Sequence, residues 1–162
     1  MRCSISRAFS QIKYDEITDD QMDELLNSYC DDLLTMVETL DIDIMAHLIC
    51  PTGYPLRRFN KFYDMAPYKA KIEKILRAII RKGIAFEVNA ALFLEIDGKQ
   101  PNLFVFEMFR DLGGHLITVS TDAHSPGAVG NGLAERVQWI KDMGFRNIFY
   151  FKDRKAIPCT IK

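Results

Sequence analysis

The stretch VSTDAHSP at residues 119–126 places a carboxylate and an imidazole two residues apart, where an apolar strand ends. Residues 116–119 predict a short buried strand, and residues 127–130, which begin and end with glycine, predict the turn after it. On extended backbone, side chains at positions i and i+2 point to the same side, so Asp122 and His124 are expected to reach into one cavity. The pair is half of a candidate metal site. The alternative is that Asp122 caps the following helix and that His124 is an ordinary loop histidine.

Length and composition predict one soluble globular domain over residues 1–162. The chain has 162 residues, of which 48% are hydrophobic and 27% are charged, and this is enough for a proper core. Its formal net charge is -1, and Lys and Arg are spread along the chain. The lack of a basic block argues against a nucleic-acid partner.

Cysteine usage and the first residues indicate the compartment. The four cysteines are widely scattered and form no C-x-x-C pair, which is typical of a reducing cytoplasm. Residues 1–7 lack the apolar segment of an export signal, and no apolar run is long enough to span a bilayer. We therefore expect a cytoplasmic protein without a membrane anchor.

Helical and extended patterns alternate along the chain from Thr18 onward. Thr18 and Gln21 form a capping-box pair that starts the first helix. Helices are expected over residues 18–40, 68–80, 101–112 and 129–143, and strands over 42–48, 84–89, 116–120 and 145–151. A loop with two prolines and a glycine is expected after residue 48. Such an alternation predicts an α/β fold with a parallel sheet and right-handed crossovers.

In parallel sheets, functional residues gather at the carboxyl ends of the strands. Several polar side chains fall at predicted strand ends, and they are His47, Glu87, Asn89, Asp122 and His124. His115 precedes its strand, so we expect it on the opposite edge in a structural role. His47 considered alone fits an ordinary core histidine, but its shared edge with Asp122 and His124 favours a site.

Three sequence blocks together resemble the polymerase and histidinol phosphatase (PHP) family, in its histidinol-phosphatase-like branch. The blocks are DIMAHL at 43–48, FEVN at 86–89 and VSTDAHSP at 119–126, and the resemblance runs from about Tyr14 to Phe151. It implies a distorted (β/α)7 TIM-like barrel and a cluster of divalent metal ions that hydrolyses phosphate esters. The substrate would be a small phosphomonoester.

The resemblance also implies roles for individual residues. Asp122 matches a ligand of the first metal, His124 of the second and His47 of the third, and no further catalytic residue is assigned. Asn89 matches a polar position that lines the substrate site. Arg57 matches an arginine that meets the substrate phosphate, with a solvated loop charge as the alternative. Mixed imidazole and carboxylate ligation suits zinc, manganese or iron.

The chain departs from the family in the first half of the barrel. Family members open with a His-x-His strand, whereas this chain has no histidine before His47. We therefore expect a single partial PHP domain, the C-terminal half of the barrel, whose strands are apolar on both faces. An open half-barrel would expose an edge and an apolar patch, which predicts a homo-oligomer or a complementing N-terminal half.

Two hypotheses follow from this departure. In the first, the chain is a piece of a metal-dependent phosphatase, either cut from a longer chain or partnered by a separate N-terminal half, and is inactive by itself. In the second, it is a catalytically silent half-barrel that acts as an oligomerising or binding module. A nuclease-type or polymerase-associated PHP domain is disfavoured, because the chain has no basic stripe.

Overall fold

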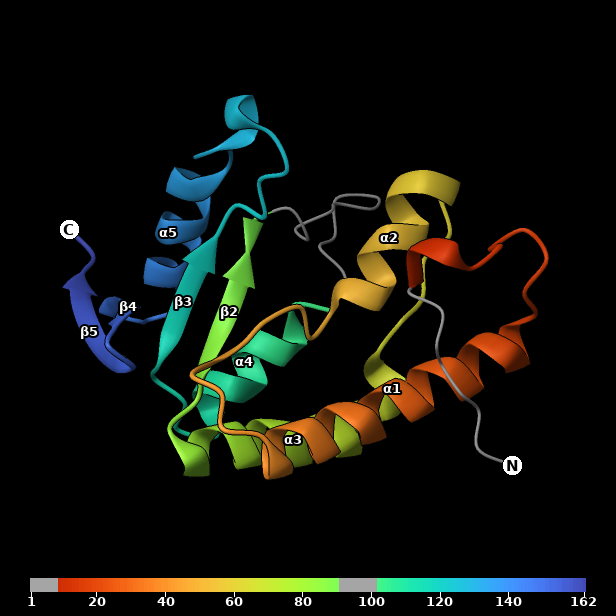
Figure 1. The fold of residues 1–162 in the computed structure, drawn as a ribbon, viewed down its shortest axis with the longest axis horizontal. Coiled ribbons are helices and arrows are strands. Elements are labelled where there is room, and N and C mark those ends of the chain that lie inside the picture. Colours follow the sequence, from red (N-terminus) through yellow and green to blue (C-terminus); the bar gives the residue numbers. More distant parts are fainter. Residues whose placement is uncertain (1–8, 91–101) are drawn as a thin grey trace.

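Helices and strands alternate along the chain in the computed structural model, which describes residues 9–90 and 102–162 (Figure 1). The helices are α1 (Asp19–Thr39), α2 (Cys50–Phe59), α3 (Lys69–Lys82), α4 (Phe104–Asp111) and α5 (Leu133–Asp142). The strands are β1 (Ile44–Met45), β2 (Ala85–Asn89), β3 (Ile117–Ser120), β4 (Asn147–Lys152) and β5 (Lys155–Thr160). Short 3-10 helices span Phe9–Gln11, Ala66–Tyr68 and Pro126–Ala128.

The central sheet has three parallel strands in the order β1-β2-β3. Met45 pairs with Phe86, and Val88 pairs with Val119, so the strands run in step. The structure thus confirms an α/β fold with a parallel sheet. Because the strands are parallel, their carboxyl ends meet at one edge, and this edge carries the polar residues discussed below.

Helices α1 and α3 lie side by side along one end of the sheet (Figure 1). Thr18 and Gln21 form the predicted capping box, in which each side chain accepts a hydrogen bond from the other residue's backbone N–H. At the other end of α1, the Nζ of Lys82 donates to the carbonyl oxygens of Val37 and Leu40, at 2.6 and 3.0 Å. This places a cation on carbonyl groups that have no partner within the helix.

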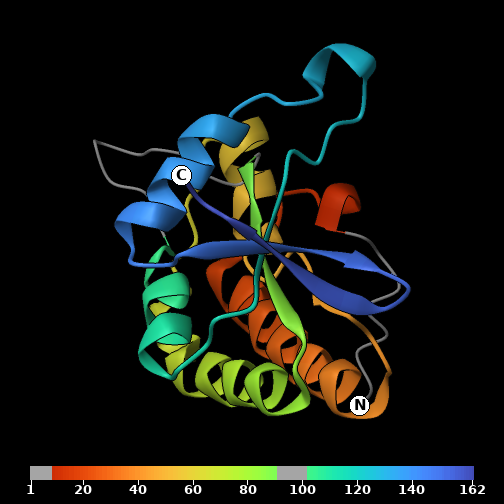
Figure 2. The ribbon, with the colours of Figure 1, turned by 90° about the vertical axis from the view of Figure 1, so that its left-hand side faces the viewer.

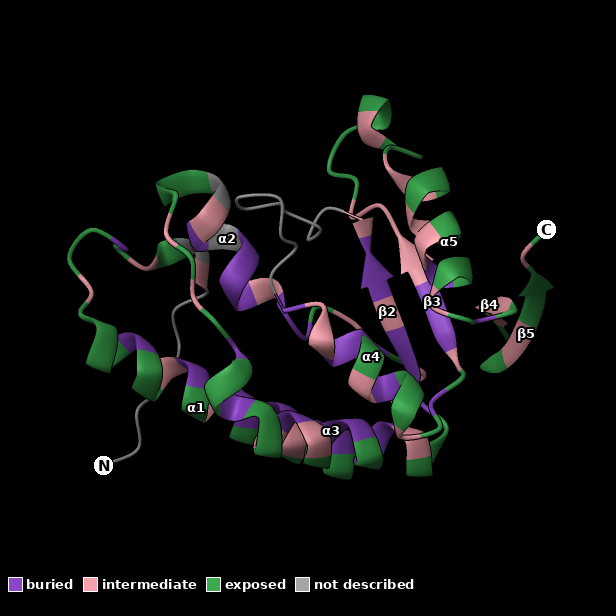
Figure 3. Cartoon of the chain, turned by 180° about the vertical axis from the view of Figure 1, so that it is seen from behind, coloured by how far each residue is buried: buried purple, intermediate pink, exposed green. Residues whose placement is uncertain are grey.

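The face of the sheet that meets the helices carries an aromatic core. Phe86 of β2 stacks on Phe106 of α4, with ring centroids 4.9 Å apart, and also contacts Phe109 at 5.3 Å. All three rings are buried, and Figure 3 shows β2 and the adjoining part of β3 as the most buried strands. Side chains that alternate along β2 therefore send one set into this core.

The opposite face of β2 and β3 is polar towards the carboxyl ends of the strands, so the expectation of strands apolar on both faces was wrong for these two strands. Glu87 pairs with Thr118, and Asn89 pairs with Ser120, so these four side chains share one face. Asn89 and Thr118 are buried there. The cause of the error is that Phe, Val and Ile dominate the average hydrophobicity of β2 and β3, although in these two strands they occupy only one face.

The last predicted strand does not join the parallel sheet. It is β4, and it pairs antiparallel with β5 through a two-residue turn, Asp153 and Arg154, with φ values of 50° and 61°. Positive φ at both turn residues matches the right-handed twist of a hairpin. β4 lies beside β3, and the hairpin crosses the direction of the sheet strands (Figure 2).

The tip of the hairpin is anchored near the start of β1. The guanidinium of Arg154 donates to the carboxylates of Asp41 at 2.7 Å and Asp43 at 3.2 Å. These hydrogen bonds and the nearby positive charge hold the pKa of Asp41 below its ordinary value. Strand β4, which the sequence predicted as part of the parallel sheet, thus belongs to a separate hairpin, because its partner β5 follows it directly in the chain.

The segment after His47 is a helix and not the loop expected from its prolines and glycine. Pro51 lies in the first turn of α2, where its missing N–H removes no helical hydrogen bond. The hydroxyl of Thr52 donates to the carbonyl of Ile49 at 2.8 Å and accepts from the buried amide of Asn102 at 3.0 Å. This local bond and the tertiary contact with Asn102 hold the first turn against the cost of Pro55 in the helix.

None of the helices within residues 9–90 and 102–162 combines the length and the apolar character needed to cross a bilayer.

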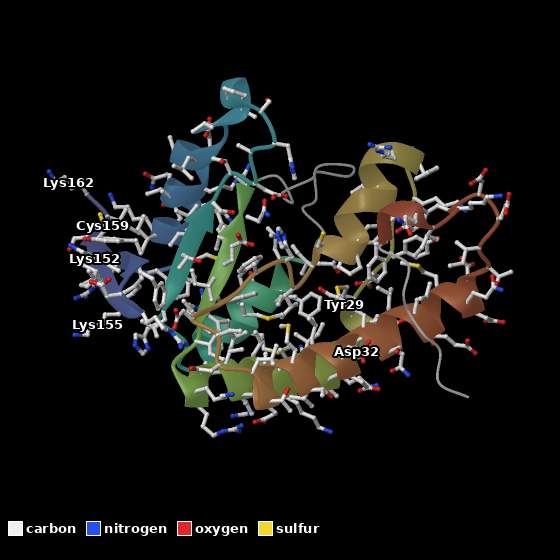
Figure 4. The ribbon with its side chains drawn as sticks, in the orientation of Figure 1. Tyr29, Asp32, Lys152, Lys155, Cys159 and Lys162 are labelled. Atoms are coloured by element: carbon white, nitrogen blue, oxygen red, sulfur yellow. The ribbon has the colours of Figure 1, made fainter. Side chains whose placement is uncertain are left out.

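The described cysteines differ sharply in environment, and this predicts their reactivity. Burial raises the pKa of the Cys30 thiol to about 11, whereas Cys159 is exposed on β5 (Figure 4). Since the thiolate is the reacting form, Cys159→Ser is expected to remove a fast phase of the reaction with a disulfide reagent, and Cys30→Ser is not.

Deprotonation of the Cys30 thiol favours the unfolded chain, so the stability that this thiol contributes is lost as pH rises towards 11. A reaction of Cys30 as fast as that of Cys159 in the native chain would contradict the predicted difference in reactivity.

Candidate functional site

The carboxyl edge of the parallel sheet holds most of the side chains that the sequence singled out. His47 follows β1 by two residues, Asn89 ends β2, and Asp122 and His124 follow β3. Arg57 lies in α2, and its side chain is outside the described part of the chain. His115 is exposed at the opposite edge, beside Gly114 and the end of α3, as expected.

His47 sits in a strained backbone conformation, with φ at 62°. Such left-handed geometry costs an ordinary residue about 1–2 kcal/mol, so neighbouring groups must hold it. The hydroxyl of Tyr29 on α1 donates to the His47 carbonyl at 2.9 Å, and Figure 4 labels this tyrosine. Burial raises the pKa of Tyr29 far above its ordinary value, which keeps the hydroxyl a neutral donor.

Two side chains of β2 contact His47 from the other side. The carboxylate of Glu87 accepts a hydrogen bond from the His47 backbone N–H, with 3.1 Å from N to Oε2. The same oxygen lies 3.8 Å from the ring Nδ1. The side-chain amide nitrogen of Asn89 lies 3.3 Å from Nδ1. His47, Glu87 and Asn89 therefore form one polar group, in which the imidazole is 45% exposed and the carboxylate 10% exposed.

Sequence reasoning placed Glu87 at this edge but assigned it no role in the site. Its Oε1 accepts a hydrogen bond from the Ser120 hydroxyl at 2.7 Å, which links β2 to β3. A carboxylate inside an otherwise apolar strand, two residues before a polar Asn89, was the available signal. A buried acid at a strand end needs such partners, because an unpaired buried charge is costly.

Asp122 and His124 form a second group above the end of β3. The His124 Nε2 lies 3.6 Å from the Asp122 Oδ1, with side-chain exposures of 89% and 28%. The strand ends before them, and Asp122 has φ at 51°, so the expected extended geometry was wrong although the two side chains are close. Asp tolerates the left-handed conformation better than most residues.

An open hollow of about 480 Å³ adjoins the second group. Its lining includes Ala90, Thr121, Asp122, His124, Ser125 and Asn131. The His47 group instead lines a separate cavity of about 10 Å³, which has room for about one water-sized group. Of these two spaces, the hollow beside Asp122 and His124 is large enough to admit a small ligand.

The donor set fits a divalent metal in kind but not in number. Imidazole and carboxylate are ligands of zinc, manganese or iron. Within residues 9–90 and 102–162, however, no three histidine, cysteine or acidic side chains come together in a group that could hold an ion. The described residues therefore offer two partial ligand groups on one edge.

Comparison with known proteins finds that the chain is similar to histidinol-phosphatases. A probable histidinol-phosphatase of Thermotoga maritima is 31% identical over 123 residues, which are 76% of this chain and 50% of that protein. A probable histidinol-phosphatase of Clostridium acetobutylicum is 20% identical over 111 residues, 68% of this chain and 43% of that protein. No family model matches the chain.

A solved structure shares the fold. It is histidinol phosphate phosphatase from Lactococcus lactis, complexed with zinc, L-histidinol and phosphate. The TM-score is 0.69 at 26% identity, and the match covers 83% of this chain and 51% of that one. This chain thus spans about half the length of the relatives it matches.

Proposed function

We propose that this chain, which is related to the histidinol-phosphatases of the PHP family over about half of their length, supplies part of a metal-dependent phosphomonoesterase. The observation that carries the proposal is the shared carboxyl edge of His47, Asp122 and His124 in a chain with these relatives. A small phosphomonoester such as histidinol phosphate would be the substrate.

The side chains at this edge would divide the work. His47, Asp122 and His124 would contribute metal ligands, and Asn89 would line the substrate site beside His47. Arg57 would meet the substrate phosphate, for which a guanidinium fork is well suited. A divalent metal, when bound, would supply hydroxide near neutral pH and polarise the phosphoryl oxygens.

Further ligands would come from outside the described residues, either from a longer chain of which this sequence is a piece or from a separate complementing half. The two partial groups of the described residues do not make up a set of three ligands, which is the number of protein ligands that a catalytic zinc site takes. A complementing half, or a second copy of the chain, would complete the edge. The same shortage supports the alternative of a catalytically silent binding module.

Complementation of activity separates these two functions. The chain would be mixed with the half of the Thermotoga maritima relative that it does not match, in the presence of manganese, zinc or iron. We expect phosphate release from histidinol phosphate above that of either half, abolished by Asp122→Ala and retained in His115→Ala, the matched control on the opposite edge. A mixture that binds without turnover would favour the silent module.

A further inference from the structure

The geometry points to Glu87 as a positioning residue for His47. We propose that its carboxylate orients the His47 imidazole and keeps the ring proton on Nδ1, so that Nε2 carries the lone pair. The use of that lone pair as a metal ligand rests on the proposed function. The orientation itself is a property of this chain alone.

The Glu87 carboxylate is itself fixed in place. It lies within β2, is 10% exposed, and its Oε1 accepts the Ser120 hydroxyl at 2.7 Å. Its Oε2 is then directed to His47, where it accepts the backbone N–H at 3.1 Å. One carboxylate therefore ties the ends of all three parallel strands together.

The same Oε2 faces the imidazole ring. It lies 3.8 Å from Nδ1, and a negative charge at this place favours the tautomer with a proton on Nδ1. The Asn89 amide nitrogen lies 3.3 Å from Nδ1 and, as a donor, would favour the opposite tautomer, so the Glu87 charge must outweigh this donor for the proton to stay on Nδ1. A histidine ligand commonly shows this arrangement, with a carboxylate or carbonyl on the nitrogen that does not bind the metal.

Tyr29 provides a matched control for this role. Its hydroxyl donates to the His47 backbone carbonyl at 2.9 Å, so it stabilises the same strained backbone from the other side. If Glu87 served only the backbone, the loss of Tyr29 and the loss of Glu87 would affect the ring alike. If Glu87 positions the ring, only its loss changes the tautomer.

Nitrogen-15 NMR of the histidine rings in the metal-free chain tests the proposal. At a pH above the imidazole ionisation range, the His47 Nδ1 of the native chain is expected at a pyrrole-type, protonated shift. In Glu87→Gln this resonance should move towards the pyridine-type shift, and Ser120→Ala, which frees the carboxylate without removing it, should move it part of the way. Tyr29→Phe should leave it unchanged.

A His47 protonated on Nε2 in the native chain would overturn the proposal, and so would the same tautomer in Glu87→Gln. Ser120→Ala keeps the proposal testable should Glu87→Gln fail to fold. Because the measurement needs neither metal nor turnover, its result is independent of the complementation assay. A failed phosphatase assay would therefore leave the tautomer result standing, and the reverse also holds.

Discussion

Purified by itself, the chain is expected to release phosphate from histidinol phosphate no faster than buffer with the same metal ion. The described residues form two partial ligand groups, and the His47 group and the Asp122 pair line separate cavities. Without a complete ligand set, little metal would be held at this edge to lower the pKa of a bound water, and hydroxide would be scarce. Phosphate release with added manganese, zinc or iron is the measurement.

The control for this expectation is Asp122→Ala, which should leave the background rate unchanged. Metal analysis of the purified chain should find less than one tightly bound ion per chain. Rapid metal-dependent turnover by the native chain alone, lost in Asp122→Ala, would show that the described residues already form a working site.

Phe86→Ala is expected to lower the free energy of unfolding by about 3–5 kcal/mol. Phe86 is buried between Phe106 and Phe109, at centroid distances of 4.9 and 5.3 Å. Its removal takes away the buried ring and leaves a cavity that the rigid strand β2 cannot close. For a domain of this size such a loss consumes a large part of the total stability. Urea denaturation followed by circular dichroism measures it.

Tyr150→Ala is the matched control for the loss of an aromatic ring. Tyr150 lies on β4 and is 55% exposed, so its removal should cost no more than about 1 kcal/mol. Equal losses for the two variants would mean that the Phe86 cluster is not the centre of the core.

Much of the local structure could be predicted because its signals lie close together in the sequence. The capping box of Thr18 and Gln21 starts α1 as expected, and Gly83 ends α3 with φ at 68°, where a residue without Cβ is favoured. The two helices and the β2 and β3 strands follow from periodicity over a few turns or pleats. The strand ends also located the edge that carries His47 and Asp122.

The separation of the candidate site into two groups could not be predicted in this way. An alternating pattern indicates that a strand has two faces, but it does not state how the chain bends after the strand. Asp122 leaves the extended conformation at φ 51°, and His47 leaves it at 62°. The His47 group and the Asp122 pair line different cavities.

The sequence by itself determined the helices, the parallel strands and the edge at which the polar residues gather, since these depend on hydrophobic periodicity and on caps within a few residues. Only the tertiary structure decided the partners of those residues. Glu87 meets His47 across 40 positions, and Arg154 meets Asp41 across 113. Contacts at such separations depend on how the elements pack, because the burial of the aromatic face of β2 fixes which side chains the opposite face presents to each other.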